Sequence, residues 1–210
     1  MIKPGKVLVI YGPRRVGKTT LLKDFLDKSK LKYKLDSGDN IRTQEIFNAQ
    51  VFSEILPYAE GYELLAIDEA QQIKNIGMGL KILVDNLPDI TIIATGSSSF
   101  ELSQQIGEPL TGRKRTISLF PFSQEELLSL YNKHELKERL EEFLIYGSYP
   151  EVITAGNCNE KREVLVELVN SYLLKDIFTL ERIKGTKQIF DLLKLIAFQV
   201  GNEVSLNELA

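Results

Sequence analysis

One stretch decides the fold of this chain: Gly12-Pro13-Arg14-Arg15-Val16-Gly17-Lys18-Thr19. It fits the pattern G-x-x-x-x-G-K-[ST]. Glycines at both ends let the backbone curl so that successive N–H groups point inward, which makes a concave nest for phosphate oxygens. Lys18 can reach the β and γ phosphates of a nucleotide, and the Thr19 hydroxyl can join a Mg²⁺ shell. We therefore expect residues 12–19, together with Thr20, to bind the phosphates of a nucleotide.

The sequence on either side of this loop supports that interpretation. Residues 6–11 form an apolar, β-branched run that predicts a buried strand. Residues 20–26 show helical spacing, with four apolar side chains on one face, and the positive end of that helix dipole points at the loop. Strand, loop and helix is the order that phosphate binding needs, so a glycine-rich turn that binds nothing is the weaker alternative.

The composition excludes several classes of protein. The 210 residues include 26 Lys and Arg against 29 Asp and Glu, a formal charge of −3, so the chain lacks the overall basic footprint of a dedicated nucleic-acid binder. Cys158 and His134 are each the only residue of their type, which excludes an internal disulfide and a Cys/His zinc cluster. No apolar run approaches the length of a membrane span, and we expect a reducing, cytoplasmic setting without membrane partners.

Strand and helix patterns alternate through the first 120 residues. Further strands are expected at 31–35, 63–69, 89–95 and 115–120, and helices at 41–58, 76–86 and 100–106. This alternation predicts an α/β fold: a parallel sheet of the phosphate-loop NTPase type, with flanking helices and right-handed crossovers.

The pattern becomes wholly helical after Pro121. A capping box, Ser123 with Glu126, opens this part, and helical periodicity covers 135–145, 159–174 and 188–199. We expect a nucleotide-binding core at 1–121 and a helical lid at 122–180. A second capping box, Ser205 with Glu208, begins a helix within about one turn of the last residue, which suggests a fragment of a longer protein.

Two acids follow the third predicted strand. Asp68 ends the strand and can hold Mg²⁺ through its waters. Glu69 comes next and would project toward the γ-phosphate, where a carboxylate can orient and deprotonate an attacking water. This pair favours hydrolysis over phosphoryl transfer to a second substrate; the alternative is a pair of exposed acids at a strand end. Thr95 and Ser97 end the neighbouring strand, where they either hold the water or γ-phosphate or cap the helix near residue 100.

Other classes of phosphate-loop protein fit less well. Asp68-Glu-Ala-Gln71 lacks the glycine of a GTPase D-x-x-G switch, and Asn132-Lys-His-Glu135 departs from the guanine-reading N-K-x-D by ending in Glu on a predicted helix. A helicase with the same acidic motif needs a second RecA-like domain, for which this chain has no room. A kinase needs an acceptor site, and the sequence shows none.

With these residues in place, the chain resembles the AAA-type ATPases. More closely, it is similar to the prokaryotic ATPases of this type that carry a C-terminal domain of unknown function. The matching pieces are residues 11–22, Ile67-Asp-Glu-Ala-Gln71, Thr95-Gly-Ser-Ser98, Leu110-Thr-Gly-Arg113, Phe120-Pro-Phe-Ser123, Tyr146-Gly-Ser-Tyr-Pro-Glu151 and Tyr172-Leu-Leu-Lys-Asp-Ile177. The chain departs from such relatives before the first strand, where they usually carry a helical segment and it has only residues 1–5.

The resemblance implies a site and an assembly beyond the phosphate loop. It implies that residues 181–210 begin a winged-helix-like region, through which a DNA or protein client could bind. It also implies that Arg113 is an arginine finger acting on the nucleotide of a neighbouring subunit, hence a homo-oligomer, with a solvated basic turn as the alternative.

The expected function is ATP hydrolysis that drives or switches a conformational change. Lys18, Thr19 and the loop backbone would bind ATP or ADP, Asp68 would support Mg²⁺, and Glu69 would activate water. The alternative is a nucleotide-responsive binding module that scarcely turns over, and a kinase is less favoured.

Overall fold

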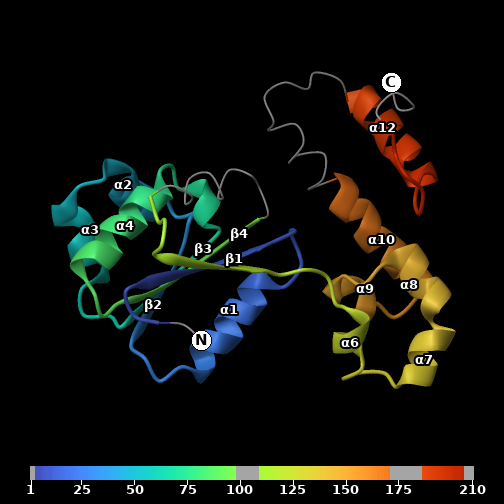
Figure 1. The fold of residues 1–210 in the computed structure, drawn as a ribbon, viewed down its shortest axis with the longest axis horizontal. Coiled ribbons are helices and arrows are strands. Elements are labelled where there is room, and N and C mark those ends of the chain that lie inside the picture. Colours follow the sequence, from blue (N-terminus) through green and yellow to red (C-terminus); the bar gives the residue numbers. More distant parts are fainter. Residues whose placement is uncertain (1–2, 98–108, 171–185, 206–210) are drawn as a thin grey trace. The chain divides into compact units, whose positions relative to one another are not determined.

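The computed structural model of the protein describes residues 3–97, 109–170 and 186–205. The chain divides into two compact units, Met1–Arg162 and Glu163–Ala210, and each is described by itself. The first unit holds a sheet with its flanking helices, followed by a group of short helices (Figure 1). In the second, the described residues hold the end of one helix and a further helix, α12 (Thr186–Phe198).

The sheet has five parallel strands in the order β2-β3-β4-β1-β5. Their bounds are β1 Lys6–Gly12, β2 Tyr33–Ser37, β3 Leu64–Asp68, β4 Thr91–Ser97 and β5 Lys114–Ser118. Gly12 pairs with Ser97, and Ser37 pairs with Asp68, so the carboxyl ends of these strands meet at one edge. The predicted α/β fold with a parallel sheet is confirmed. Each predicted strand begins and ends within two residues of the observed strand.

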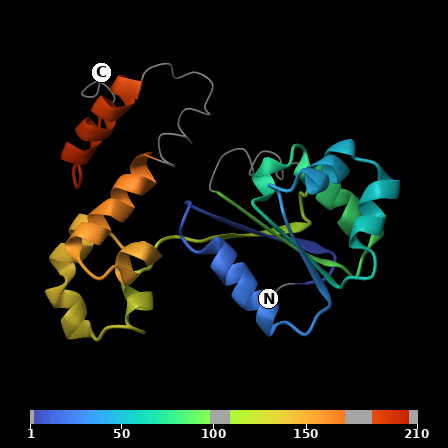
Figure 2. The ribbon, with the colours of Figure 1, turned by 180° about the vertical axis from the view of Figure 1, so that it is seen from behind.

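Alternating side chains of the strands build two apolar layers. Val7 and Val9 of β1 point into one layer, which also takes fully buried side chains from the helices α2, α3 and α4. Leu8 and Ile10 point into the other, where they meet Leu22 of α1. Figures 1 and 2 show α1 on one face of the sheet and α2, α3 and α4 on the opposite face. The helix bounds are α1 Lys18–Lys28, α2 Ile41–Ala49, α3 Phe52–Ala59 and α4 Ile76–Asn86.

The single helix predicted at 41–58 is wrong, because two helices occupy that stretch. Gln50 adopts a left-handed conformation (φ 54°) and ends α2, with its N–H bonded to the carbonyl of Phe47. Phe47 in α2 and Ile55 in α3 are both fully buried in the same apolar layer, so the apolar spacing continues across the break. Pro57 lies inside α3, which ends two residues later at Ala59.

The helices after the sheet are short. They are α6 Gln124–Leu127, α7 Lys133–Glu138, α8 Leu140–Tyr146, α9 Pro150–Thr154 and α10 Cys158–Leu168. The predicted capping box of Ser123 with Glu126 is confirmed, and a second box, Asn132 with Glu135, opens α7. The expected single helix at 135–145 is instead α7 and α8, which meet at Arg139.

Several expectations fall outside the described residues or stay untested. The helix expected at 100–106 and the Glu208 member of the second predicted capping box lie outside the described ranges. The limits of the core at 121 and of the lid at 180, and the winged-helix-like region after it, stay predictions. In the part of the chain that the structure describes, none of the helices has both the length and the apolar character that crossing a bilayer requires.

Adjacent leucines of α1 offer a matched test of the smaller apolar layer. Leu22 is 1% exposed and Leu21 is 44% exposed. Leu22→Ala should lower the free energy of unfolding by about 2–5 kcal/mol, because it removes buried methyl groups and leaves a cavity. Leu21→Ala makes the same chemical change at the surface and should cost less than about 1 kcal/mol. Chemical denaturation of both variants measures the difference; equal losses would contradict this assignment of the buried face.

A polar cluster fixes the end of β2 against α3. The Tyr58 hydroxyl donates to Asp36 Oδ2 (2.7 Å), and the Ser37 N–H and Asn40 Nδ2 donate to Asp36 Oδ1 (2.8 and 3.1 Å). Burial acts to raise the pKa of the Asp36 carboxyl, but hydrogen bonds from Tyr58, Ser37 and its other neighbours together hold it below the usual value. Since these bonds favour the ionised form, they stabilise the fold only while Asp36 is charged.

This cluster predicts a pH-dependent effect of Tyr58→Phe. Near neutral pH the variant should lose about 1 kcal/mol of stability, because a partly solvated, charge-assisted hydrogen bond is removed. The contribution of Asp36 is fully present above its unfolded pKa of about 3.9 and is lost as the pH falls through the lower folded value. The difference between the variant and the unaltered protein should therefore shrink in acid. Tyr62→Phe is the control; a gap that is constant with pH would contradict the assignment.

Candidate functional site

The glycine-rich loop joins β1 to α1 at the carboxyl edge of the sheet. Lys18 is the first residue of α1 and is only 5% exposed. Its ammonium group donates to the carbonyl oxygens of Gly12 (2.9 Å) and Pro13 (2.8 Å), so the side chain folds back into the curve of the loop. A single buried cation is thereby held within a ring of backbone, where an incoming anion would meet it.

Both glycines of the motif are required by the geometry. A Cβ on Gly12 would lie 2.3 Å from the carbonyl oxygen of Leu119 and 3.0 Å from Val16, so no larger residue fits there. Gly17 has φ 96°, a conformation that other residues rarely adopt, and it precedes the first turn of α1. Val16 is itself buried (4% exposed), which packs the loop against the end of β1.

Hydrogen bonds draw Asp68 and Thr19 together. The Thr19 hydroxyl donates to Asp68 Oδ2 (2.7 Å) across 49 positions of sequence. The Thr95 hydroxyl, at the end of the neighbouring strand β4, donates to the other oxygen, Asp68 Oδ1. The carboxylate that ends β3 is thus held by one hydroxyl from the loop and one from β4, and the structure unites these three sequence-predicted residues.

Glu69 follows Asp68 in a left-handed conformation (φ 50°), which turns the chain from β3 into a short 3₁₀ helix at Ala70–Gln72. Its N–H donates to the Thr95 hydroxyl (3.3 Å), and its carboxylate Oε2 accepts a hydrogen bond from the Gln71 amide. No pattern in the sequence predicts a role for Gln71 or a bond from Thr95 to both acids. The spacing of two residues between Glu69 and Gln71 was the available signal for the first contact.

Arg14 and Arg15 lie in the middle of the loop. Arg15 has φ 60° and so stands in the left-handed region, which favours glycine. Its Nη1 forms an ion pair with Glu151 Oε2 (2.9 Å), in the first turn of α9. In the sequence, Glu151 is the last residue of the family-like stretch Tyr146-Gly-Ser-Tyr-Pro-Glu151, and its spacing does not indicate a contact with the loop.

Ser97 and Arg113 occupy different positions relative to the loop. Ser97 is the last residue of β4, is 4% exposed and pairs with Gly12 across the sheet, so it lies beside the loop. Arg113 directly precedes β5, at the opposite edge of the parallel sheet, and its Nε contacts Asp85 Oδ1 (2.6 Å). The structure therefore does not bring Arg113 to the loop of its own chain. Whether either residue acts on a nucleotide stays a prediction.

The residues present suit a phosphate anion with a divalent cation. The Lys18 ammonium lies against the loop backbone and can bind the anion, and the amino-terminal end of α1, which begins at Lys18, favours negative charge. The Thr19 hydroxyl and the Asp68 carboxylate supply two oxygen atoms 2.7 Å apart, and oxygen ligands are the type that Mg²⁺ prefers. The other coordination positions of the metal would be left to phosphate and water. Within the described ranges, no group of three or more His, Cys, Asp and Glu side chains could hold a metal without such help.

Comparison with known proteins gives two family matches. A family model described as an AAA domain matches residues 4–128, and one described as a domain of unknown function matches residues 137–210. A protein of Methanocaldococcus jannaschii, named as uncharacterized, is 30% identical over 99% of this chain and 50% of its own length. Another, from Haemophilus influenzae, is 28% identical over 95% of this chain and 53% of its own. The chain thus spans about half the length of these relatives.

One solved structure is also similar at low identity. It is titled as the FIGL-1 AAA domain in complex with ADP, and it aligns with a TM-score of 0.49 at 17% identity, over 79% of this chain and 65% of the other.

The central position of Thr95 yields a test of the hydrogen-bonded network. Thr95→Val keeps the shape of a fully buried side chain, but it removes the hydroxyl that donates to Asp68 Oδ1 and accepts from the Glu69 N–H. The bond from Thr19 to Asp68 Oδ2 stays in place. We expect a loss of about 1–3 kcal/mol of unfolding free energy. Thr91→Val, a buried threonine on the same strand, is the matched control and should change stability less. Equal effects in thermal or chemical denaturation would show that the network does not depend on Thr95.

Proposed function

Since the chain belongs to the AAA domain family, we propose that it binds ATP with Mg²⁺ at residues 12–20 and hydrolyses it to ADP and phosphate. One observation carries the proposal: the Thr19 hydroxyl and the Asp68 carboxylate, from separate elements, meet at 2.7 Å beside the loop. A turn that only connects a strand to a helix has no need for this acid. A site for a nucleotide and its metal needs it at that place.

Lys18 is proposed to bind the β and γ phosphates. In the structure its ammonium donates to two carbonyls of the loop, Gly12 and Pro13. A phosphate oxygen is a stronger, charged acceptor for the same donors, so the ammonium would exchange a carbonyl for phosphate when ATP enters. The backbone N–H groups of the loop and the first turn of α1 would add further donors.

Thr19 and Asp68 are proposed to hold Mg²⁺, which when bound would neutralise charge on the β and γ phosphates. The hydroxyl would ligate directly, and the carboxylate would act through waters. Thr95 donates to Asp68 and so would fix the direction of that carboxylate.

Glu69 is proposed to orient and deprotonate the attacking water. It follows the metal-site carboxylate directly and is anchored through its N–H to Thr95. Its carboxylate bonds to the Gln71 amide, which would hold the side chain in one position until water displaces the amide or joins it. Thr95 and Ser97, at the end of β4, would line the same end of the site.

The alternative function is a binding module that responds to a nucleotide and scarcely turns over. The same Glu69–Gln71 contact favours it, because an amide that keeps the carboxylate occupied would leave the water without a base. Turnover measured over many cycles separates the two functions. A kinase remains the less favoured proposal, and it would need an acceptor substrate.

The assembly and the client also belong to this proposal. Arg113 lies at the edge of the sheet opposite its own loop, which suits an action on a neighbouring subunit, and its pairing with Asp85 would then have to break. The proposed homo-oligomer depends on this action of Arg113 on a neighbouring subunit. Because the chain spans about half of its relatives, a DNA or protein client of the C-terminal region stays a proposal for the whole protein.

Phosphate release from Mg-ATP tests the proposed reaction. Glu69→Gln should keep ATP binding and lose roughly two to four decades of turnover, the range for a lost general base. Lys18→Ala should lose ATP binding itself, because a buried charge-assisted contact disappears. Glu45→Gln, an exposed acid on α2, removes the same charge elsewhere and should change neither value.

Three outcomes would overturn parts of this scheme. Turnover by Glu69→Gln at the rate of the unaltered protein would require another base. Tight ATP binding by the unaltered protein without repeated turnover would favour the binding module. Full ATP affinity in a folded Lys18→Ala variant would remove the loop as the binding site.

A further inference from the structure

We propose that Arg15 and Glu151 form a latch between the phosphate loop and the short helices after the sheet, and that the phosphates of a bound nucleotide open it. The proposal rests on the proposed function, because it needs nucleotide phosphates at the loop. It assigns a role to Glu151 and makes α9, with the helices attached to it, the part of the chain that responds to nucleotide binding.

The ion pair joins two distant parts of one compact unit. Arg15 Nη1 lies 2.9 Å from Glu151 Oε2, across 136 positions of sequence. Both residues belong to the unit Met1–Arg162. Arg15 has an unusual positive φ of 60° in the middle of the loop, so its side chain leaves the backbone in a direction that the loop conformation dictates. Any rearrangement of the loop around an anion would act directly on this side chain.

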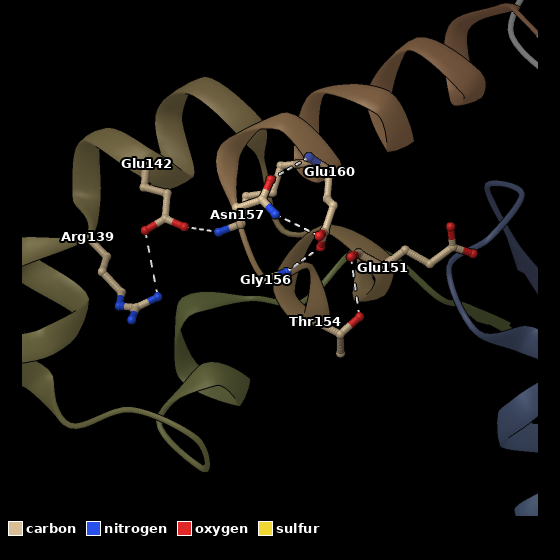
Figure 3. Close-up of polar contacts among 8 residues, drawn as sticks. Arg139, Glu142, Glu151, Thr154, Gly156, Asn157 and Glu160 are labelled. Atoms are coloured by element: carbon tan, nitrogen blue, oxygen red, sulfur yellow. Dashed lines mark hydrogen bonds and ion pairs between the residues drawn. The ribbon is translucent and has the colours of Figure 1, made fainter.

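Glu151 differs from the neighbouring acids in where its carboxylate is used. Glu142 pairs with Lys161, and Glu160 accepts hydrogen bonds from Asn157 and from the backbone of the same turn. The Glu142 contact joins α8 to α10, and the Glu160 contacts hold the turn at the start of α10 (Figure 3). The Glu151 carboxylate extends away from them in Figure 3, toward the ribbon of the amino-terminal part, while its backbone oxygen accepts from Thr154. Its side chain is thus directed outward to the loop.

Two hydrogen bonds between Phe122 and Ser148 hold the start of α9 near the end of the sheet. The Phe122 N–H donates to the Ser148 carbonyl oxygen (3.0 Å), and the Ser148 hydroxyl donates to the Phe122 carbonyl oxygen (2.6 Å). Phe122 lies on the segment that leaves β5, and Ser148 lies two residues before α9. The start of α9 is therefore tied to the exit of the sheet, and the Arg15–Glu151 pair adds a second, charged connection.

The exposure of the pair makes it easy to displace. The Arg15 and Glu151 side chains are 24% and 47% exposed, so water screens their attraction and the net stabilisation is small. A nucleoside triphosphate carries several negative charges, and one of its phosphates can accept two parallel hydrogen bonds from a guanidinium. It also repels the Glu151 carboxylate. The phosphates would therefore draw Arg15 to themselves and release Glu151, which frees α9 from its charged connection.

A distance measurement between two labels tests the latch. Cys158 is the only cysteine and is exposed at the start of α10, so one spin label is placed there. Lys23→Cys on the exposed face of α1 supplies the second position. Without nucleotide, Glu151→Gln should shift or broaden the distance distribution in the same way that a non-hydrolysable Mg-ATP analogue does in the protein with Glu151. Glu141→Gln, an exposed acid in the first turn of α8, is the control and should leave the distribution unchanged.

A charge exchange and an affinity measurement complete the test. The double variant Arg15→Glu with Glu151→Arg should restore the original distribution without nucleotide, because the pair is re-formed in the opposite sense. Glu151→Gln should also bind the ATP analogue more tightly, by up to about five-fold, since the phosphates no longer compete with a carboxylate for Arg15.

The outcomes separate failure of the latch from failure of the proposed function. If Glu151→Gln gives the distribution of the unaltered protein without nucleotide, the latch is wrong even if ATP binds. If the unaltered protein binds no ATP analogue, the proposed function fails, and with it nucleotide as the signal that opens the latch. An analogue that binds without changing the distance distribution also overturns the latch.

Discussion

The Asp68 carboxylate is the group on which the site depends. It ends a buried strand, and its two oxygens accept hydrogen bonds from Thr19 and Thr95. A partly buried carboxylate needs hydrogen bonds from donors or from water to offset its lost hydration. The Thr19 and Thr95 hydroxyls supply such donors to Asp68. Hydrogen bonds to this group therefore connect the first helix, the third strand and the fourth strand. The parallel sheet makes the arrangement possible, because all carboxyl ends of its strands lie at one edge.

Several residues in the connections at this edge of the sheet have an unusual backbone conformation. Arg15, Glu69 and Asn75 have positive φ without being glycine, and each lies in a connection that leaves the carboxyl end of β1 or β3. Such conformations cost on the order of 1 kcal/mol or more and persist where the surrounding structure requires them. At Glu69 the requirement is visible: the turn brings the N–H to Thr95 and the side chain to Gln71. The local cost is offset by the packing of the two apolar layers that hold the strands.

The short helices after the sheet are stabilised in a different way from the core. They bury few large side chains, Leu127, Leu136 and Val152 among them, and rely on capping boxes and on ion pairs such as Glu142 with Lys161. The hydrogen bonds of the capping boxes are individually weak and exposed to water, whereas the Glu142–Lys161 pair is partly buried. A region held in this way can change its contacts at little cost, whereas the sheet cannot. This difference gives a physical reason why a response to nucleotide would appear in the helices rather than in the core.

The sequence by itself determined the elements whose signals are local. The strand before Gly12, the loop and the helix after it, the acids at the end of a buried strand and the capping box at Ser123 all follow from neighbouring residues, and the family resemblance is confirmed. The break at Gln50 was missed because the apolar spacing continues across it. Contacts between residues far apart in sequence were decided by the tertiary structure alone: Thr95 with both acids, Arg15 with Glu151, and Arg113 with Asp85. Periodicity and spacing describe one element at a time. Which side chains meet depends on the strand order β2-β3-β4-β1-β5 and on the path of the chain after β5, and neither is written in any local pattern.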